Sequence, residues 1–311
     1  MAYRSAAYCS GDLGPGNIQS HISDIQNSGL TTVILWALHI GRPEIAGQKY
    51  GDQIFNDFPQ NLIVSGGTFN PNGSSAIAAW PGQVAQLKKA GGVSKIFLSV
   101  GGAHPPVDDF TTIEYMLNNN MAGTLAANLK ALRQAFTANG TCVIDGFDLD
   151  CEENVSQQTI VEFSKILFGL GFEVTFCPYA NPSFWQGCMQ TLWNGGDKVS
   201  WWNLQCYSGG YSNRNELPSW IGALAGVVGS QAAPSYLVPG LAVAGAEGDG
   251  QCPTGSNSIC DTFAGWSSLG LRGGFLWMYD SIVANPAACN GQASLAAYVS
   301  AIDDGLNNNC P

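Results

Sequence analysis

Short apolar segments rich in β-branched residues alternate along the whole chain with longer amphipathic segments. Eight of the apolar segments fit buried strands, at residues 4–9, 32–40, 95–102, 142–152, 173–179, 200–207, 236–243 and 273–280. Eight intervening or following segments fit helices, at residues 17–28, 80–91, 122–138, 156–170, 184–194, 216–229, 258–268 and 292–306. The clearest helix is 122–138, where apolar residues recur every three or four positions and an Asn-Gly pair marks the end. Such alternation is typical of parallel βαβ units.

Eight βαβ units predict a closed (β/α)8 barrel, a TIM barrel of the α/β class, in one domain over residues 1–311. An open doubly wound sheet is the alternative, but it requires a Gly-rich phosphate-binding turn after an early strand, and the sequence has none. The segment 44–79 is longer than an ordinary strand-to-helix loop, so we expect an excursion there, such as a hairpin. In a TIM barrel the active site lies at the C-terminal ends of the strands.

Charge and composition restrict the partners of the chain. The net charge is −11, which argues against a nucleic-acid partner, because few cations are present to neutralise phosphates. No run approaches 18 apolar residues, so we expect no membrane span and no membrane partner. Only 11% of residues are charged, and there are ten cysteines, a composition that favours a secreted protein whose signal peptide is absent from this sequence.

The cysteines divide into two kinds. Four lie in apolar runs and are typical of buried thiols: Cys142, Cys151, Cys177 and Cys206. Two further pairs look like loop-closing disulfides, Cys252 with Cys260 and Cys289 with Cys310, although sequence alone does not fix connectivity. No pair has metal-ligand spacing and the three histidines are scattered, so we expect no metal and no cofactor.

The segment VIDGFDLDCEEN, residues 143–154, places carboxylates inside an otherwise apolar strand. Asp148, Asp150 and Glu152 are two residues apart, so their side chains share one face of the strand. The alternate positions are apolar and should face the surrounding helices: Phe147, Leu149 and Cys151. The barrel lumen is therefore the predicted place of the three carboxylates, with Glu152 nearest the catalytic mouth and Asp148 deepest.

Three stacked carboxylates cannot all ionise freely, because burial and like charge raise the pKa of at least one of them. A carboxylic acid that stays protonated near neutral pH can act as a general acid. The alternative is a salt-bridged or calcium-binding cluster, for which the neighbouring strands supply only Lys95, at the opposite end of its strand.

Several motifs resemble those of glycoside hydrolase family 18, the chitinases and their relatives, which are TIM barrels. DGFDLDCE (145–152) resembles the DxxDxDxE motif on strand four, and LSVGG (98–102) resembles SxGG on strand three. LQCY (204–207) is similar to the Q-x-Y variant of the plant-type enzymes, FLWMYD (275–280) places Trp277 where the family has a strand-eight tryptophan, and AAYC places Tyr8 on strand one.

The resemblance implies a role for each matched residue. Glu152 matches the general acid that protonates the glycosidic oxygen, and Asp150 matches the residue that orients the 2-acetamido group of the substrate. Asp148 would share a proton with Asp150. Tyr207 would hydrogen-bond the acetamido group, and Trp277 would form the floor under the −1 sugar. Ordinary core packing is the alternative for the last two residues.

Other residues complete the predicted site. Ser99 is expected to hydrogen-bond below the Asp pair, Gly101 to allow close strand packing, and Gln205 to belong to the Q-x-Y motif. Trp185, in the loop after strand five, is a candidate sugar-stacking residue. Three further residues are expected to do no chemistry or to fill the core: Asp145, Glu153 and Trp201.

The resemblance predicts a monomeric, retaining endo-chitinase acting on chitin or other N-acetylglucosamine oligosaccharides. Residues 244–272 are too few for the α+β insertion of many exo-acting members, which favours an open cleft. An endo-β-N-acetylglucosaminidase acting on N-glycans is the first alternative, and a non-catalytic sugar-binding barrel is the second. Sequence does not separate the first two, because the loops at the barrel mouth decide between them.

Overall fold

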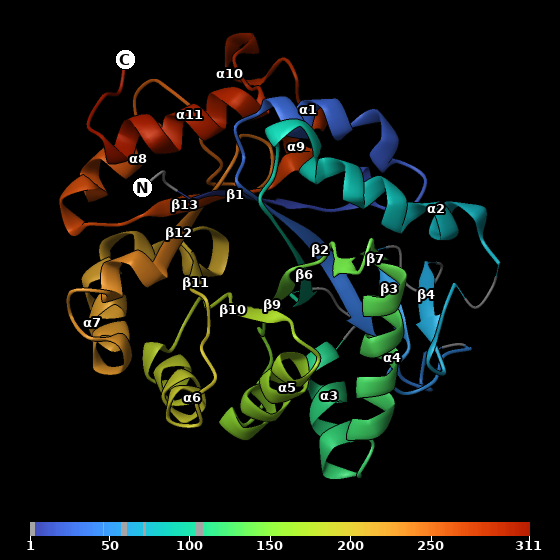
Figure 1. The fold of residues 1–311 in the computed structure, drawn as a ribbon. Helices are drawn as coiled ribbons and strands as arrows, with labels where there is room; N and C mark the ends of the chain where they lie inside the picture. The colour runs from blue at the N-terminus through green and yellow to red at the C-terminus, as the bar shows by residue number, and fades with distance from the viewer. Residues whose placement is uncertain (1–3, 46, 57–60, 71–72, 104–107) are drawn as a thin grey trace.

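Eight parallel strands close into a barrel in chain order (Figure 1). The structure is a computed structural model that describes residues 4–45, 47–56, 61–70, 73–103 and 108–311. The barrel strands are β1 (Arg4–Cys9), β2 (Thr32–Ile40), β6 (Lys95–Gly101), β9 (Gly146–Asp150), β10 (Glu173–Phe176), β11 (Trp202–Gln205), β12 (Leu237–Ala242) and β13 (Gly273–Trp277). Strand β1 pairs with both β2 and β13, which closes the ring. The predicted TIM barrel is confirmed, and each of its strands lies within a predicted segment.

Helices cover the outside of the barrel (Figure 1). They are α1 (Ile22–Asn27), α2 (Ser75–Val84), α3 (Asp109–Asn118), α4 (Ala122–Ala135), α5 (Gln157–Gly169), α6 (Pro182–Asn194), α7 (Leu217–Val228), α8 (Ile259–Trp266), α9 (Tyr279–Ala284), α10 (Ala288–Gly291) and α11 (Leu295–Leu306). Each predicted helical stretch overlaps one of these helices. Helices α3, α9 and α10 were not predicted.

The boundaries around the fourth barrel strand differ from the prediction. Helix α4 ends at Ala135, and the chain then forms a small hairpin of β7 (Thr137–Ala138) and β8 (Thr141–Cys142). Asn139 and Gly140 both have positive φ, at 51° and 80°, as a two-residue hairpin turn of type I′ requires. The Asn-Gly pair is therefore a strand turn and not the end of a helix, and the barrel strand begins only at Gly146.

The expected excursion after the second strand is confirmed. Strand β3 (Gln53–Phe55) pairs antiparallel with β2, and β4 (Leu62–Ser65) and β5 (Thr68–Phe69) follow, each antiparallel to the strand before it. Ile40, the last residue of β2, pairs with Gln53, so this small sheet continues from the C-terminal end of the barrel strand.

Two apolar layers flank the barrel strands. The larger layer lies between strands and helices and contains Phe147, Leu149 and Cys151, as the alternation predicts. A smaller cluster fills the lumen: Ala6, Tyr8, Ile34, Phe97, Cys177, Trp201, Tyr207, Val238, Ala242 and Phe275. Trp201 packs edge-on against Phe97 with ring centroids 5.0 Å apart, which confirms that it is a core residue.

The disulfide pairing differs from the prediction. The bonds join Cys252 to Cys289 and Cys260 to Cys310. Helices α8 and α11 pack against each other in Figure 1, and this long-range packing brings the start of α8 to the C-terminal end of the chain. Sequence proximity was therefore a poor guide, because the partners lie 37 and 50 residues apart.

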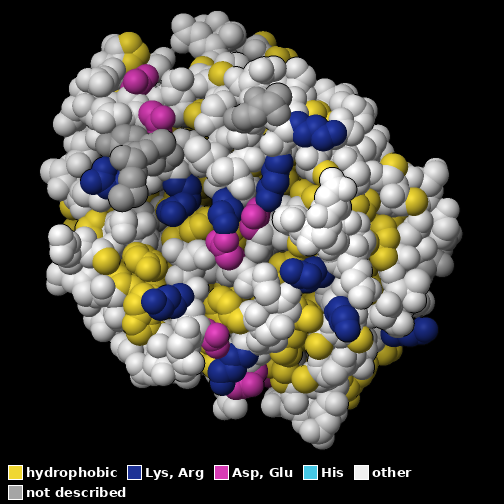
Figure 2. Space-filling model, viewed as in Figure 1, with side chains coloured by type: hydrophobic (Ala, Val, Ile, Leu, Met, Phe, Trp, Pro, Cys, Tyr) yellow, Lys and Arg dark blue, Asp and Glu magenta, His cyan; other side chains and the backbone are white. Residues whose placement is uncertain are grey.

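Basic side chains gather around the middle of the face shown in Figure 2, although the whole chain carries a net charge of −11. In the described part of the chain no helix is both long and apolar enough to cross a bilayer.

Candidate active site

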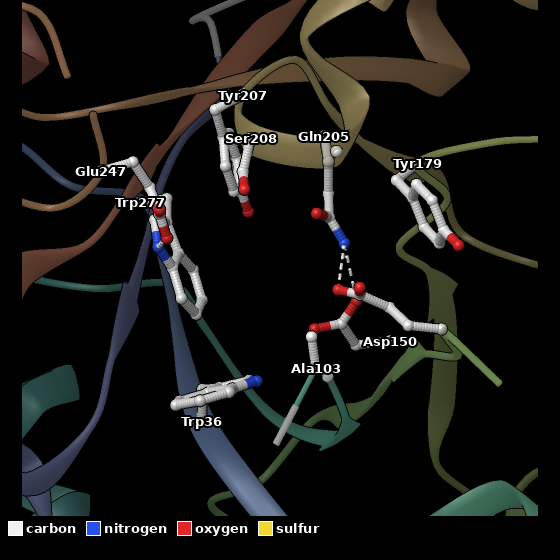
Figure 3. Close-up of a pocket in the computed structure, with 12 residues that line it drawn as sticks. Trp36, Ala103, Asp150, Tyr179, Gln205, Tyr207, Ser208, Glu247 and Trp277 are labelled. Atoms are coloured by element: carbon white, nitrogen blue, oxygen red, sulfur yellow. Dashed lines mark hydrogen bonds between the residues drawn. The ribbon is translucent and has the colours of Figure 1, made fainter. Parts of the chain in front are cut away.

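The C-terminal ends of the barrel strands surround a pocket of about 120 Å³ (Figure 3). Strands β2, β6, β9, β11 and β13 and the segments that follow them supply most of its walls. The residues that line it are Trp36, Gly102, Ala103, Asp150, Glu152, Tyr179, Gln205, Tyr207, Ser208, Gly209, Glu247 and Trp277. The pocket lies where the active site of a TIM barrel is expected.

Asp148 lies below the pocket as a fully hydrogen-bonded buried carboxylate. Its Oδ2 accepts from the Tyr8 hydroxyl at 2.7 Å and from Ser99 Oγ at 3.0 Å. Its Oδ1 accepts from Thr175 Oγ1 at 2.6 Å and from Asn203 Nδ2 at 2.9 Å. Four donors match the four lone-pair sites of an ionised carboxylate, so they favour the anionic form and oppose the effect of burial, which raises the pKa of Asp148.

Asp150 and Glu152 lie above it and share one amide donor. Nε2 of Gln205 is 2.9 Å from Asp150 Oδ1 and 3.1 Å from Glu152 Oε1, as the dashed lines in Figure 3 show. Asp150 is the last residue of β9 and Glu152 follows two residues later, and the Gln205 side chain reaches both from β11. One amide group therefore holds both carboxyl groups on the same side of the pocket.

The pocket favours protonation of both acids. Burial, followed by the charges of Glu152 and Asp148, raises the pKa of Asp150 well above its ordinary value. Burial also raises the pKa of Glu152; the hydrogen bond from Gln205 lowers it, and the charge of Glu247 raises it further. Two neighbouring acids with raised pKa values can hold a proton between them.

Aromatic rings form the opposite wall. The rings of Trp277 and Tyr207 are nearly parallel, with an interplanar angle of 12° and centroids 5.7 Å apart. The Trp36 ring packs edge-on against Trp277 with ring centroids 5.0 Å apart, and the Tyr8 ring centroid lies 5.6 Å from that of Trp277. Figure 3 shows Trp277 and Tyr207 across the pocket from Asp150. An apolar wall that faces polar groups is suited to a sugar ring, which has hydroxyl edges and apolar C–H faces.

Tyr207 supplies a further polar group. Its ring is 4% exposed and lines the pocket, and burial raises the pKa of the phenol well above its ordinary value, so the hydroxyl keeps its proton. The hydrogen bonds found in the described residues give this hydroxyl no partner within the chain. The Tyr207 hydroxyl is therefore available to a ligand.

The remaining predicted residues have other positions. Trp185 is on helix α6 and not in a loop, so its placement was predicted wrongly; its side chain is 3% exposed, packs on Phe176 and lines a separate small pocket that Glu152 also lines. Gly101 has φ of +97°, and a Cβ there would meet the Asp150 backbone and the Phe110 ring. Glycine thus allows β6 to end against the strand that carries the acids.

The two outlying acids of the segment have structural partners. Asp145 pairs with Lys88 at 2.6 Å and accepts from the Ile96 amide at 2.7 Å. Glu153 accepts from the amides of Phe110 and Thr111 at the start of helix α3. Neither carboxylate lines the pocket.

Several residues of the pocket were not predicted from sequence, and Trp36, Tyr179 and Glu247 have the largest side chains among them. Glu247 lies in the segment after β12 and accepts from the Trp277 indole at 3.2 Å. Strand alternation would place Trp36 on the same face of β2 as Ile34, which is the only sequence signal for it. Tyr179 and Glu247 lie in loops, whose side-chain directions follow no periodicity.

Comparison with known structures places this geometry in context. A GH18 chitinase from Pseudoalteromonas aurantia matches with a TM-score of 0.64 at 13% identity, over 97% of this chain and all of that one. The catalytic domain of a chitinase from Pyrococcus furiosus matches with a TM-score of 0.64 at 11% identity, over 99% of this chain and 96% of that one. The chain has the fold of the GH18 chitinases.

A plant class V chitinase mutant from Cycas revoluta, in complex with (GlcNAc)3, shares this chitinase fold with a TM-score of 0.51 at 11% identity, over 96% of this chain and 99% of that one. No protein-family model matches the sequence, and no curated protein matches it. In this fold the acidic motif occupies the fourth barrel strand, directly beneath the pocket.

Proposed function

We propose that this protein is a retaining endo-chitinase, a glycoside hydrolase that cleaves β-1,4 bonds between N-acetylglucosamine units. One observation carries the proposal: a protonatable acid, Glu152, and a second acid, Asp150, share the amide of Gln205 opposite an aromatic wall. The chitinase fold supports the same reaction class.

In the first step Glu152 gives its proton to the glycosidic oxygen as the bond from that oxygen to the anomeric carbon breaks. The carbonyl oxygen of the 2-acetamido group attacks the anomeric carbon and forms an oxazolinium ion. Asp150 orients the acetamido group by accepting from its N–H, and the Tyr207 hydroxyl bonds to the same group. Asp148, held below by its four donors, raises the pKa of Asp150 through its charge and so helps Asp150 to hold a proton.

In the second step the carboxylate of Glu152 takes a proton from water, which attacks the anomeric carbon and opens the oxazolinium ring. Two displacements at one carbon leave its configuration unchanged. Trp277 packs under the reacting sugar throughout. The rise in negative charge on Glu152 during the first step strengthens its hydrogen bond from Gln205, so this bond favours the transition state.

The positions of the acids argue against a protein nucleophile. A second carboxylate acting as nucleophile must flank the scissile bond opposite the acid. Asp150 ends strand β9, Glu152 follows it two residues later, and both acids accept from the same Gln205 amide. Glu247 is the other carboxylate among the described residues of the lining, and it is exposed and engaged by the Trp277 indole. A nucleophile within the substrate fits this arrangement better.

The segment between β12 and β13 supports endo cleavage. It contains helix α8 and a short 3-10 turn (Ser267–Leu269), with no added α+β module to wall the pocket. A chain of sugars can therefore lie across the mouth in both directions. An endo-β-N-acetylglucosaminidase would use the same catalytic groups and differs in the glycan that the mouth loops admit.

Incubation with chitin oligosaccharides and, in parallel, with a high-mannose glycopeptide separates these two functions by product mass. We expect internal cleavage of the chitin oligosaccharides and none of the glycopeptide. The Glu152→Gln variant should lose nearly all hydrolysis and still bind the oligosaccharide. Cleavage of the glycopeptide alone would favour the glycosidase, and cleavage of neither would contradict both.

A further inference from the structure

A pocket of about 560 Å³ lies at the N-terminal end of the barrel. Its lining residues are Arg4, Thr31, Thr32, Ser94, Lys95, Ser200, Trp201, Ser235, Tyr236 and Arg272. Each of them begins a barrel strand or lies within two residues before one. The catalytic acids lie at the opposite ends of the strands, so the side chains that fill the lumen separate the two pockets.

This N-terminal pocket is basic. Arg4, Lys95 and Arg272 line it, and no Asp or Glu is among the described residues of its lining. In Figure 1 the barrel is seen along its axis, and Lys and Arg side chains gather around the middle of the same view in Figure 2. The chain as a whole carries a net charge of −11, so a pocket whose charged lining is entirely cationic favours a ligand of negative charge.

Arg4 provides a buried donor that the chain does not use. It lies on the same face of β1 as Ala6 and Tyr8, which belong to the cluster that fills the lumen. Its guanidinium carbon lies 4.0 Å from the centroid of the Trp201 ring, another residue of that cluster. Nη1 of Arg4 is buried and finds no hydrogen-bond acceptor within the part of the chain that the structure describes. Burial lowers the pKa of Arg4, but a guanidinium stays charged in a protein, so its charge and its N–H group both lack a bonded partner.

One acid, Glu173, adjoins the pocket but is engaged by other groups. It accepts from Lys95 Nζ through Oε1 and from Ser200 Oγ at 3.2 Å through Oε2, so both carboxylate oxygens have donors. Its charge raises the pKa of Arg4, but the contacts of the described residues include no hydrogen bond between the two side chains. Arg272 is exposed and forms no ion pair with any described residue. A half-buried cation without a bonded anion is costly, and an anionic ligand would remove that cost.

The groups left for a ligand are the cationic ones. Four hydroxyl groups of the lining already donate to carbonyl or carboxylate oxygens of the chain: Thr31, Ser94, Ser200 and Ser235. Guanidinium groups bind phosphate and sulfate through paired N–H donors, and an ammonium group adds a point charge. Three cations on a lining without acids suit a doubly charged oxyanion better than a single carboxylate.

We infer that the N-terminal pocket binds a tetrahedral oxyanion, phosphate or sulfate, free or as the ester group of a larger molecule. Arg4 Nη1, the Arg272 guanidinium and the Lys95 ammonium hold it. The site goes beyond the proposed function, because it lies at the other end of the barrel from the catalytic acids and involves no chitin. The bound anion neutralises Arg4 and stabilises the folded chain in proportion to its concentration.

Calorimetry with the whole protein in a low-salt buffer at neutral pH tests this site, with inorganic phosphate, sulfate, phenyl phosphate and acetate as separate probes. We expect saturable one-to-one binding of phosphate and sulfate, and much weaker binding of acetate. Arg272→Gln should weaken phosphate binding about tenfold, because it removes charge-assisted donors. Lys130→Gln is the matched control, because it removes one positive charge at an exposed position of helix α4, outside the pocket, and should bind phosphate as the parent does.

Binding of either tetrahedral anion that Arg272→Gln weakens and Lys130→Gln does not would support the site. Tighter binding of phenyl phosphate would then identify an ester as the ligand, and equal or tighter binding of inorganic phosphate would identify the free ion. Absence of binding by both anions, acetate binding as tight as phosphate, or equal binding by Arg272→Gln and Lys130→Gln would overturn the inference. Arg4→Gln should abolish binding, and the exposed Arg272 keeps the test valid if Arg4→Gln does not fold. Chitin hydrolysis by Arg272→Gln should equal that of the parent, so failure of this site leaves the proposed function standing.

Discussion

Replacing the Gln205 side chain tests how the pocket sets the pKa and the reactivity of Asp150 and Glu152. Replacing Gln205 by Met keeps the approximate volume and removes the N–H donor to Asp150 and Glu152. A hydrogen bond to a charged group contributes about 1.5–3 kcal/mol. Because Glu152 becomes negatively charged as it gives up its proton, the loss falls on the transition state, and kcat should fall about tenfold to a hundredfold.

The same change should move the pH profile in a defined direction. Glu152 must be protonated at the start of the cycle, so activity is lost as pH rises through its pKa. The Gln205 hydrogen bond lowers the pKa of Glu152, so Gln205→Met should move the basic limb to higher pH. The charge of Glu247 raises that pKa, so Glu247→Gln should move the basic limb to lower pH.

The assay is the pH dependence of kcat and kcat/KM on a chitin oligosaccharide for the parent and both variants, with thermal unfolding as a check on folding. Glu247→Gln is the matched control variant, because it also replaces one side chain that lines the catalytic pocket. Shifts of the basic limb in the same direction, or no shift in either variant, would refute the reasoning about how Glu152 is tuned.

Two further predictions concern stability. Asp148→Ala should lower the free energy of unfolding by about 3 kcal/mol in chemical denaturation, because four buried donors lose their acceptor. A loss below about 1 kcal/mol would contradict the importance of this cluster for stability. Replacing Cys260 and Cys310 by Ser removes a disulfide between residues 50 positions apart. Loop entropy predicts that the free energy of unfolding falls by about 4 kcal/mol, while hydrolysis at 25 °C is retained. An unchanged denaturation curve would show that this disulfide does not constrain the unfolded chain.

The barrel and the acidic strand could be predicted because both depend on local periodicity. Alternation places Phe147 and Leu149 among the helices and Asp148 and Asp150 in the lumen, and the structure confirms this division. The role of each carboxylate was less accessible. The donors that saturate Asp148 come from four different strands, which no local pattern connects.

The errors share a cause: contacts between residues far apart in the sequence. Helix α3 was missed because its first amides are capped by Glu153, more than 40 residues later. The disulfides follow the packing of α8 on α11 and not the spacing of the cysteines.

The configuration of the first product tests the central claim most directly. A chitin hexasaccharide is added to the protein, and the anomeric proton signals of the new reducing ends are followed by NMR before mutarotation. Substrate-assisted catalysis by Glu152 and Asp150 predicts that the β-anomer appears first and that Glu152→Gln produces almost none. Initial formation of the α-anomer, or full activity of Glu152→Gln, would contradict the account.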